Sequence, residues 1–575
     1  MKGWKQITLL IIIIFIAVGS FYYLMFSSLF KGAPPISQNS YLQLNIYGEV
    51  PERSSTNPLQ RLFAGETPSM DGLIQCIRKA KIDPKISGII LRPIASAAGW
   101  AKIEELRATL EDFKESGKPV YVYLEMAGNR DYYLALEGDM IFGPETGNLM
   151  ITGFLAQSYF IKGTLDKLGI TADFVRHGKY KDAPEIFTRK DMSDAQREVT
   201  NSILNDYYPR YIDAISSARK LTAQKVENIV NRGLYTLRDG YNDGLIDTLM
   251  YYNEFKDYLD KKNNRRLRIV SYSRYKDVPF SKLGVRGKET IALIYGLGDI
   301  VSGFGNTAPE GVITSESMAH SIRVAADNKS VKAIVMRINS PGGSGTASDI
   351  IWREVVEARK KKPVIVSVSD MAASGGYYIS MAADSIVAEP SSIVGSIGVF
   401  AGKFSFKGLY DKIGVDKVEI PRGKNADLFS DYDNFSKDQQ RLMQNNIDEF
   451  YKVFVTKAAE GRHMTYEAVD QIARGRIWTG EQGLKNGLVD KLGGLMDAIQ
   501  MAKEMSGIPV GQHVKVLIYP KQETFLQRLL SSTLDAKAKI VNQVLPGPLK
   551  NYALGFLYFK DFETLAMIPF YPEVQ

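Results

Sequence analysis

Ser374 is the residue whose setting most clearly offers chemistry. It lies among small residues in the run MAASGGYYIS (371–380), where a substrate backbone could approach its hydroxyl group. A second glycine-rich turn, SPGGSG (340–345), follows another β-branched run. Glycines in both turns would let backbone N–H groups point into a common space, which suits an oxyanion or a phosphate. The second turn lacks the lysine of a GxxxxGK[ST] loop, which disfavours nucleotide binding, and a Ser-Gly-Gly by itself is more often a tight turn than a nucleophile.

An internal repeat separates these two interpretations of Ser374. Three segment pairs match, each 245 residues apart: GIILRPI (88–94) with AIVMRIN (333–339), MAGNRDYYLALEGD (126–139) with MAASGGYYISMAAD (371–384), and DKLGI (166–170) with DKIGV (411–415). At the register of Ser374 the first copy has Asn129, and at the register of Lys181 the second copy has Ala426. These losses are complementary, so we expect one active site built from Ser374 of the second copy and Lys181 of the first.

A lysine that acts as a base must be neutral, so its pKa has to fall from about 10.4 to near 7. Burial against an apolar interface between the copies would lower the pKa of Lys181, and Lys179 is a candidate for a nearby cation that would lower it further. Without the repeat, Lys181 would be interpreted as an exposed lysine in a KYKD run. The hypothesis requires about 2.6–3.2 Å between Ser374 Oγ and Lys181 Nζ.

Histidine is not predicted to be the base. Ser374 lacks the GxSxG setting of an α/β-hydrolase, and His177 aligns with Arg422 in the other copy. We interpret His177 as a structural or surface histidine.

The elements that must position Ser374 and Lys181 form an α/β fold. Runs 333–338 and 363–369 have the composition of buried strands, and 348–361 has helical spacing between them. This βαβ order predicts a mainly parallel sheet with right-handed crossovers and a site at the carboxyl ends of strands. The chain of 575 residues is long enough for two such domains, which we place at 41–260 and 289–505.

Charge and composition exclude several classes of function. The net charge of +8 comes from segment 261–288, which carries ten basic residues against one acidic residue. This indicates a solvated connector, or else a contact with anionic lipid, and not a nucleic-acid groove. Cys76 is the single cysteine, and the four histidines have no clustered ligand spacing, so we expect no disulfide, no metal and no cofactor.

The N-terminus predicts a membrane anchor in residues 1–31. Residues 6–30 carry no charge, and 25 residues at 1.5 Å each exceed a hydrocarbon core of about 30 Å. Lys2 and Lys5 precede this run, which places the N-terminus in the cytoplasm and the body on the far side. Cleavage after Gly19 is the alternative. Residues 32–40 follow as a linker.

The C-terminal extension, 506–575, matches neither copy. Within it, residues 525–545 have helical apolar spacing. This predicts a packing face against a partner subunit, with a membrane-surface helix as the alternative.

Taken together, the anchor, the repeat and four motifs resemble the long form of the signal peptide peptidase A family, also called protease IV. The motifs are SPGG (340–343), MAASGGYYIS (371–380), VGSIGV (394–399) and GKYKDAPEIF (178–187). The resemblance implies two tandem domains similar to the Clp protease and crotonase superfamily, each a superhelix of ββα units. It also implies a serine endopeptidase of the bacterial inner membrane that degrades cleaved signal peptides and similar apolar peptides, with a periplasmic body and a homotetrameric assembly.

The resemblance also assigns roles to residues. Ser374 corresponds to the nucleophile and Lys181 to the general base. Gly342, Gly343 and Gly375 correspond to the oxyanion-hole region, and Ser396 to the hydroxyl that orients the lysine. Two alternatives share the fold: a crotonase-like enzyme acting on CoA esters, and a non-catalytic membrane scaffold.

Overall fold

The computed structural model describes residues 19–20, 35–54, 67–264, 266–303, 311–520 and 565–567. The predicted membrane anchor and the predicted helical stretch 525–545 therefore lie outside the described residues, apart from positions 19 and 20. Within the described ranges, no helix combines the length and the hydropathy needed to cross a bilayer.

The first copy is a parallel α/β unit whose six-stranded sheet has the order β10-β1-β2-β3-β5-β9. Its strands are nearly continuous runs of buried residues, as expected for a parallel sheet covered on both faces. Its elements are β1 (Ser40–Gly48), α3 (Met70–Ile82), β2 (Ile86–Ser96), α4 (Trp100–Lys114), β3 (Val120–Tyr123), β4 (Met126–Ala127), α5 (Asn129–Ala135), β5 (Met140–Gly143), β6 (Asn148–Ile151), α6 (Lys162–Leu168), β7 (Thr171–His177), α7 (Glu185–Thr188), α8 (Asp194–Arg219), α9 (Ala223–Arg232), β8 (Gly233–Thr236), α10 (Leu237–Asn242), β9 (Thr248–Leu249), α11 (Tyr252–Lys262) and β10 (Arg268–Ser271).

The second copy has a similar order of elements after α12 (Tyr272–Tyr275) and the 3-10 helix η1 (Phe280–Leu283), although β7 has no counterpart strand in it and β19 has none in the first copy. Its main sheet has the order β20-β18-β16-β14-β11-β22, in which only β18 and β20 pair antiparallel. Its elements are β11 (Glu289–Leu297), β12 (Asp299–Val301), β13 (Val312–Thr314), α13 (Ser315–Asp327), β14 (Val331–Ser340), β15 (Gly342–Ser344), α14 (Gly345–Arg359), β16 (Val364–Ala373), α15 (Gly375–Ser380), β17 (Ser385–Ala388), β18 (Ile393–Gly395), β19 (Val399–Ser405), α16 (Lys407–Ile413), α17 (Lys437–Arg462), α18 (Tyr466–Ile472), β20 (Ile477–Thr479), α19 (Gly480–Lys485), β21 (Lys491–Leu492), α20 (Leu495–Met505) and β22 (Val514–Tyr519).

The two copies match down to their helix caps. Helices α8 and α17 each have 26 residues. Both begin after a serine, Ser193 or Ser436, whose side chain accepts from a backbone N–H three residues later. Both end at a left-handed residue, Lys220 or His463, with φ of 54° and 55°. The repeat inferred from three short matches therefore extends through most of the described chain.

One expectation about the connector was wrong. Segment 261–288 is not only a solvated link, because β10 within it pairs in parallel with β1. In the same way β22, which we placed in the C-terminal extension, pairs with β11. Each copy thus ends on a strand that returns beside its own first strand. The sequence signal was obscured because exposed basic residues flank β10 at the sheet edge.

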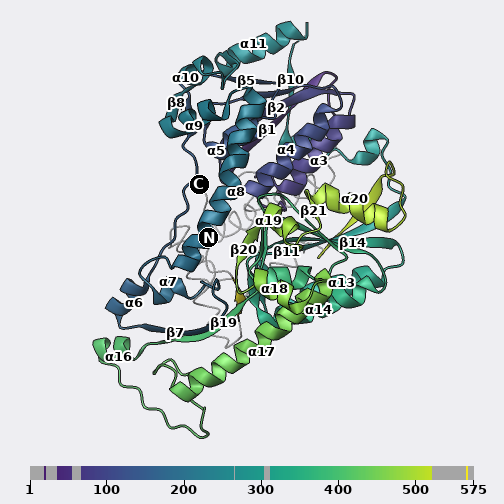
Figure 1. Cartoon of the computed structure of the whole chain (residues 1–575). Coiled ribbons are helices and arrows are strands. Elements are labelled where there is room, and N and C mark those ends of the chain that lie inside the picture. The colour runs from purple at the N-terminus through teal and green to yellow at the C-terminus, as the bar shows by residue number, and fades with distance from the viewer. Residues whose placement is uncertain are drawn as a thin grey trace, which may run out of the picture.

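The copies are joined by a third sheet of order β13-β12-β15-β23-β19-β7, to which both contribute. Strand β7 of the first copy pairs antiparallel with β19 of the second over seven residues. Figure 1 shows β7 and β19 side by side at the lower left, between α7 and α17. β23 (Leu565–Met567) completes this sheet from the C-terminal region.

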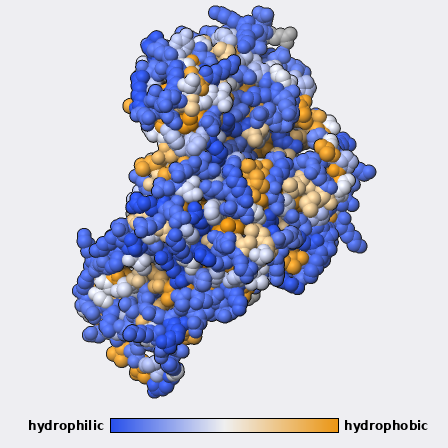
Figure 2. All heavy atoms as spheres, in the orientation of Figure 1, coloured by the Kyte–Doolittle hydropathy of each residue, from blue (hydrophilic) through white to orange (hydrophobic). Residues whose placement is uncertain are grey.

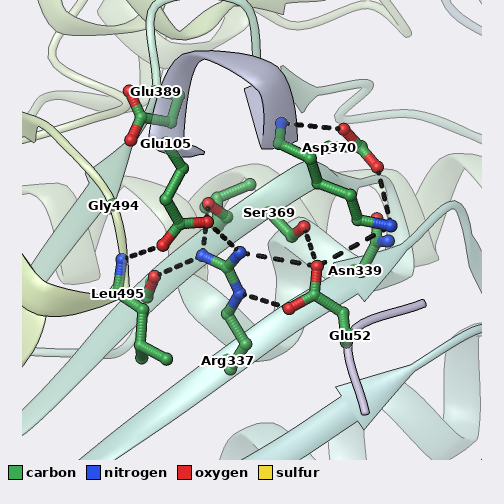
Figure 3. A network of polar contacts seen from close by, with 12 residues as sticks. Glu52, Glu105, Arg337, Asn339, Ser369, Asp370, Glu389, Gly494 and Leu495 are labelled. Carbon is green, nitrogen blue, oxygen red and sulfur yellow. Dashed lines mark hydrogen bonds and ion pairs between the residues drawn. The ribbon is translucent and has the colours of Figure 1, made fainter. Parts of the chain in front are cut away.

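A buried ionic network also joins the copies (Figure 3). Arg337 on β14 is fully buried, and its guanidinium bonds to Glu52 and Glu105, both from the first copy. Ser369 on β16 donates to Glu52 as well, and Lys102 pairs with Asp370 at 3.2 Å. The carboxylates of one copy thereby compensate the buried charge of the other, because a buried ion without its partner is strongly destabilising.

Candidate active site

Ser374 lies at the sharp turn between β16 and α15. Its side chain is fully buried, and its backbone has φ of 54° and ψ of −113°. Positive φ is uncommon for a serine and must be held by its surroundings. Here the Ser374 N–H donates to the Gly395 carbonyl at 2.8 Å, and the Tyr378 N–H donates to the Ser374 carbonyl at 2.8 Å. The strand and the helix together fix the hydroxyl at the carboxyl end of β16.

Lys181 reaches Ser374 from the other copy. It follows β7, and its Nζ lies 2.7 Å from Ser374 Oγ, within the range that the hypothesis requires. Nζ also donates to Ser396 Oγ at 3.1 Å, and to the Ser396 carbonyl at 3.4 Å. Lys181 is 1% exposed, and its amine contacts hydroxyl and carbonyl groups. Among the residues that the structure describes, no carboxylate lies at hydrogen-bond distance from this amine.

Burial lowers the pKa of Lys181 to about 7, and the nearby Asp182 carboxylate opposes this by raising it. Burial raises the pKa of Asp182 itself to about 7. The prediction that Lys179 is a nearby cation that lowers the pKa of Lys181 was wrong. Its amine bonds to Glu198 at 3.1 Å and to the Tyr180 hydroxyl at 3.2 Å, with the side chain 60% exposed. Desolvation is therefore the effect that lowers the pKa of Lys181, and it leaves the amine about half neutral near pH 7.

Two glycines that the sequence analysis missed allow the loop carrying Lys181 to reach this position. A Cβ on Gly475 would lie 2.4 Å from the Lys181 backbone nitrogen, and a Cβ on Gly178 would lie 2.4 Å from the Arg474 backbone. The Tyr180 N–H donates to the Arg474 carbonyl at 2.8 Å. Backbone packs directly on backbone here, and only glycine permits it.

Ser396 lies in a second strained turn, immediately after β18. Its φ is 51°, and its N–H donates to the Arg476 carbonyl at 2.7 Å. The hydroxyl at 3.1 Å from Lys181 Nζ occupies the place that the resemblance implies for a group orienting the lysine.

The three glycines expected around an oxyanion lie on two adjoining turns. Gly342 and Gly343 are the first two residues of β15, with φ of 106° and 151°, and Gly375 begins α15 directly after Ser374. A Cβ on Gly343 would lie 2.0 Å from the Ile300 carbonyl oxygen, so this position accepts only glycine. The Gly342 N–H donates to Ser340 Oγ at 3.2 Å.

An extended segment lies against β15 in this structure. Strand β23 pairs antiparallel with β15, in the register Gly343 to Ala566, and with β19 at Phe400. Leu565 of this strand is 6% exposed and packs against Ala183 and Phe400. The sheet edge next to Ser374 can therefore hold an extended chain by main-chain bonds and enclose an apolar side chain.

The His177 side chain contacts two residues of the second copy. Its Nδ1 lies 2.6 Å from Asp448 Oδ1, and its ring stacks on Tyr451 at 3.8 Å. This agrees with its interpretation as a structural residue. Over the ranges that the structure describes, no group of three His, Cys, Asp or Glu side chains is placed to bind a metal.

Comparisons with known proteins place this site in a family. The model for peptidase family S49 matches residues 112–266 and 357–508, and the Clp protease model matches residues 311–393. A chloroplastic serine protease SPPA of Arabidopsis thaliana is 34% identical, over 86% of this chain and 73% of its own. Protease 4 of Salmonella typhi is 33% identical over 89% and 86%, and Protease 4 of Haemophilus influenzae is 30% identical over 84% and 81%. These names describe proteases, which favours the peptidase over the CoA-ester enzyme and the scaffold.

Proposed function

Because the chain belongs to peptidase family S49 and is a serine endopeptidase, we propose that Ser374 is its nucleophile and Lys181 its general base. One observation carries this proposal: the hydroxyl and the amine lie 2.7 Å apart in a buried site, with the pKa of the amine lowered to about 7. A lysine with that pKa is about half neutral at pH 7 and can take a proton.

The reaction then runs through an acyl-enzyme. Neutral Lys181 Nζ accepts the proton of Ser374 as Oγ attacks the substrate carbonyl carbon. The protonated amine donates this proton to the leaving nitrogen, the peptide C–N bond breaks, and the acyl group stays on Oγ as an ester. A water molecule gives its proton to Nζ and attacks the ester, after which the carboxyl product leaves and Oγ recovers its proton.

Backbone amides would stabilise the oxyanion formed in each step. Gly343 and Gly375 are the donors we favour from the three glycines, because the Gly342 N–H already bonds to Ser340. Ser396 would hold the amine of Lys181 against the nucleophile through its 3.1 Å hydrogen bond.

The substrates we propose are cleaved signal peptides and other apolar, extended peptides. Support comes from the strand position beside β15 and from the buried place of Leu565 between the copies. Residues 6–30 would anchor the protein in the bacterial inner membrane with its catalytic body on the periplasmic side. A homotetramer would enclose the active sites and keep folded proteins away from them.

Hydrolysis of synthetic signal peptides, followed by mass spectrometry, tests the proposal. Ser374→Ala and Lys181→Ala should each abolish cleavage, and the double variant should be no worse than either single one, because the two residues act as a unit. Each variant is compared with the wild type for its thermal unfolding, so that a loss of fold is recognised. A Lys181→Ala enzyme with at least a tenth of the wild-type turnover would remove the lysine from the mechanism.

A further inference from the structure

A groove outside the active site lies where the two copies meet. Its volume is about 990 Å³, which is at the upper end of the range of ligand pockets. It is lined by α3 of the first copy, by η1 of the connector, and by β11, α20 and β22 of the second copy. Figure 1 shows α3 and α20 next to each other at the right of the view. None of Lys181, Ser374 and Ser396 lines this groove.

The floor of the groove is apolar. Three of its side chains, Leu293, Leu495 and Ile499, belong to one packed cluster between β11 and α20. Figure 2 shows hydrophobic side chains among hydrophilic ones in the region of α20. A concave apolar surface with few polar groups is the usual form of a small-molecule site. The apolar side chains that form this floor are Ile74, Phe280, Leu293, Leu495, Ile499 and Ile518.

The rim of the groove is cationic. The single carboxylate on it is that of Asp71, which accepts a hydrogen bond from the Gln75 side chain at 2.6 Å. Within the described ranges, no carboxylate oxygen lies within 4 Å of any basic side chain on the rim. An unbalanced positive rim around an apolar floor favours an anion with an apolar tail. The basic side chains on the rim are Arg78, Arg286, Lys503 and Lys515.

The duplication shows that Arg78 lacks the partner that its counterpart has. This counterpart, 245 residues later, is Arg323, whose guanidinium pairs with Glu354 at 2.6 Å. At the position of Glu354 the first copy has Thr109. In the part of the chain that the structure describes, Arg78 makes no ion pair and no hydrogen bond, and its guanidinium lies 6.0 Å from the Phe280 ring. The first copy therefore retains the arginine without the carboxylate.

Lys503 is a cation that the first copy does not have at this place. An offset of 243 relates α20 to α11, and it relates Lys503 to Asp260. The Asp260 carboxylate accepts the Leu267 N–H, whereas the Lys503 amine donates to the Val510 carbonyl and to Gln500 Oε1. The same corner is closed in one copy by a carboxylate and in the other by an ammonium group. The fold of the repeat does not by itself require the positive charge.

The positive charge of Lys503 is buried and has a free donor. Lys503 is 8% exposed, and two of the three N–H groups of its amine are used by the bonds named above. Burial lowers the pKa of Lys503, and the nearby charge of Arg78 lowers it further. Two cations held together without a carboxylate are costly unless an anion binds beside them. A negatively charged head group would offset this repulsion.

We propose that this groove binds a fatty-acid carboxylate, with its head group at Arg78 and Lys503 and its alkyl chain over the apolar floor. An alkyl chain needs no hydrogen bonds. The groove offers few to a peptide, because the side chains of Gln75 and Gln500 are already hydrogen-bonded to their neighbours. The ligand contacts α3 of the first copy and α20 of the second, and so it bridges the two copies.

Photolabelling of the full chain in a nonionic detergent tests the proposal. The probe is a dodecanoate that carries a diazirine in its chain, and mass spectrometry after digestion locates the label. The readout is a position in the chain, so partition of the probe into micelles does not imitate binding. We expect label in the peptides that carry η1, α20 or β22, displaced by dodecanoate and not by methyl dodecanoate. Octanoate should compete at least tenfold more weakly, because it buries fewer CH₂ groups.

Variants separate recognition of the anion from apolar adsorption. Arg78→Met with Lys503→Met should lower the labelling of these peptides at least tenfold, whereas Arg78→Lys with Lys503→Arg keeps both charges and should retain at least half of it. Lys424→Gln, at a side chain 78% exposed outside the groove, is the matched control and should not change it. Thermal unfolding is measured for each variant. If the double Met variant is unfolded, Arg78→Met alone carries the test, because among the described residues this side chain has no hydrogen bond to lose.

Several results would overturn the proposal. Labelling outside the groove only, or labelling that persists without the two cations, would leave no anion site. Equal competition by the methyl ester would mean that the groove recognises no charge. Displacement by an apolar peptide with a free C-terminal carboxylate, and not by dodecanoate, would make the groove a peptide site. Ser374→Ala should be labelled like the wild type, so a failure of the proposed chemistry would leave this inference standing.

Discussion

A change of pH is the most informative perturbation of this enzyme, because the proposed base titrates near neutral pH. Burial moves the pKa of Lys181 from 10.5 to about 7. At about 1.36 kcal/mol per pH unit, this is roughly 5 kcal/mol of preference for the neutral amine. Activity requires that neutral form, so kcat/KM should rise with pH through about 7 and reach a plateau by about pH 8. At pH 6 it should be about a tenth of the plateau value.

Three variants separate the causes of this rise in kcat/KM with pH, which we call the limb of the profile. Lys179→Gln should leave it unmoved, because the Lys179 amine faces Glu198 and Tyr180 and not the site. Asp182→Asn should move the limb to lower pH, since the Asp182 carboxylate raises the pKa of Lys181. His177→Asn should keep the limb. The assay is kcat/KM for a short chromogenic peptide between pH 5 and 10.

Two results would refute the reasoning. A limb that is absent in His177→Asn would assign the base to a histidine. A rise that continues to pH 10 without a plateau would mean that Lys181 has an ordinary pKa and is not desolvated in solution.

Three further predictions concern stability and geometry. Lys181→Met should be more stable than the wild type near pH 7. The pKa of Lys181 is about 7 in the folded state and about 10.5 in the unfolded state, so the unfolded wild type binds more protons between these two pH values. The difference in free energy of unfolding between Lys181→Met and the wild type should therefore shrink as the pH rises from 7 to about 10.5. Thermal unfolding at pH 7 and pH 9.5 checks this, and an unchanged difference would contradict it. Gly475→Ala should lower kcat at least a hundredfold, because its Cβ would force the Lys181 backbone away, whereas Gly507→Ala, at a glycine of positive φ with nothing within 4 Å, should not. Arg337→Met should destabilise by about 3–5 kcal/mol by leaving Glu52 and Glu105 buried without their partner, and an unchanged Tm would contradict the role given to this network.

The sequence predicted that the serine and the lysine meet because the duplication acts as an internal control, and the structure places them 2.7 Å apart. Asn129 and Ala426 mark what each copy lost, and no property of Ser374 or Lys181 alone would have distinguished them from a turn serine and a surface lysine. The parallel sheets were equally readable, since β-branched runs such as 333–338 alternate with amphipathic segments.

What the sequence did not reveal depends on contacts between distant segments. The role of Gly475 comes from the backbone of Lys181, almost 300 residues earlier in the chain, and a positive φ leaves no local pattern. The prediction that Lys179 lowers the pKa of Lys181 was wrong because proximity in sequence does not fix the direction of a side chain. β10 was missed because its strand-forming residues stand among exposed basic ones at the edge of the sheet.

Mapping the acyl-enzyme tests the central claim most directly. The full chain is incubated with an activated ester, quenched in acid, digested and analysed by mass spectrometry for the acylated residue. The account predicts one acyl group on Ser374 in the wild type, none in Ser374→Ala, and acylation of the same residue at least a hundredfold more slowly in Lys181→Ala. An acyl group on another residue, or an unchanged rate in Lys181→Ala, would contradict a site built from the two copies.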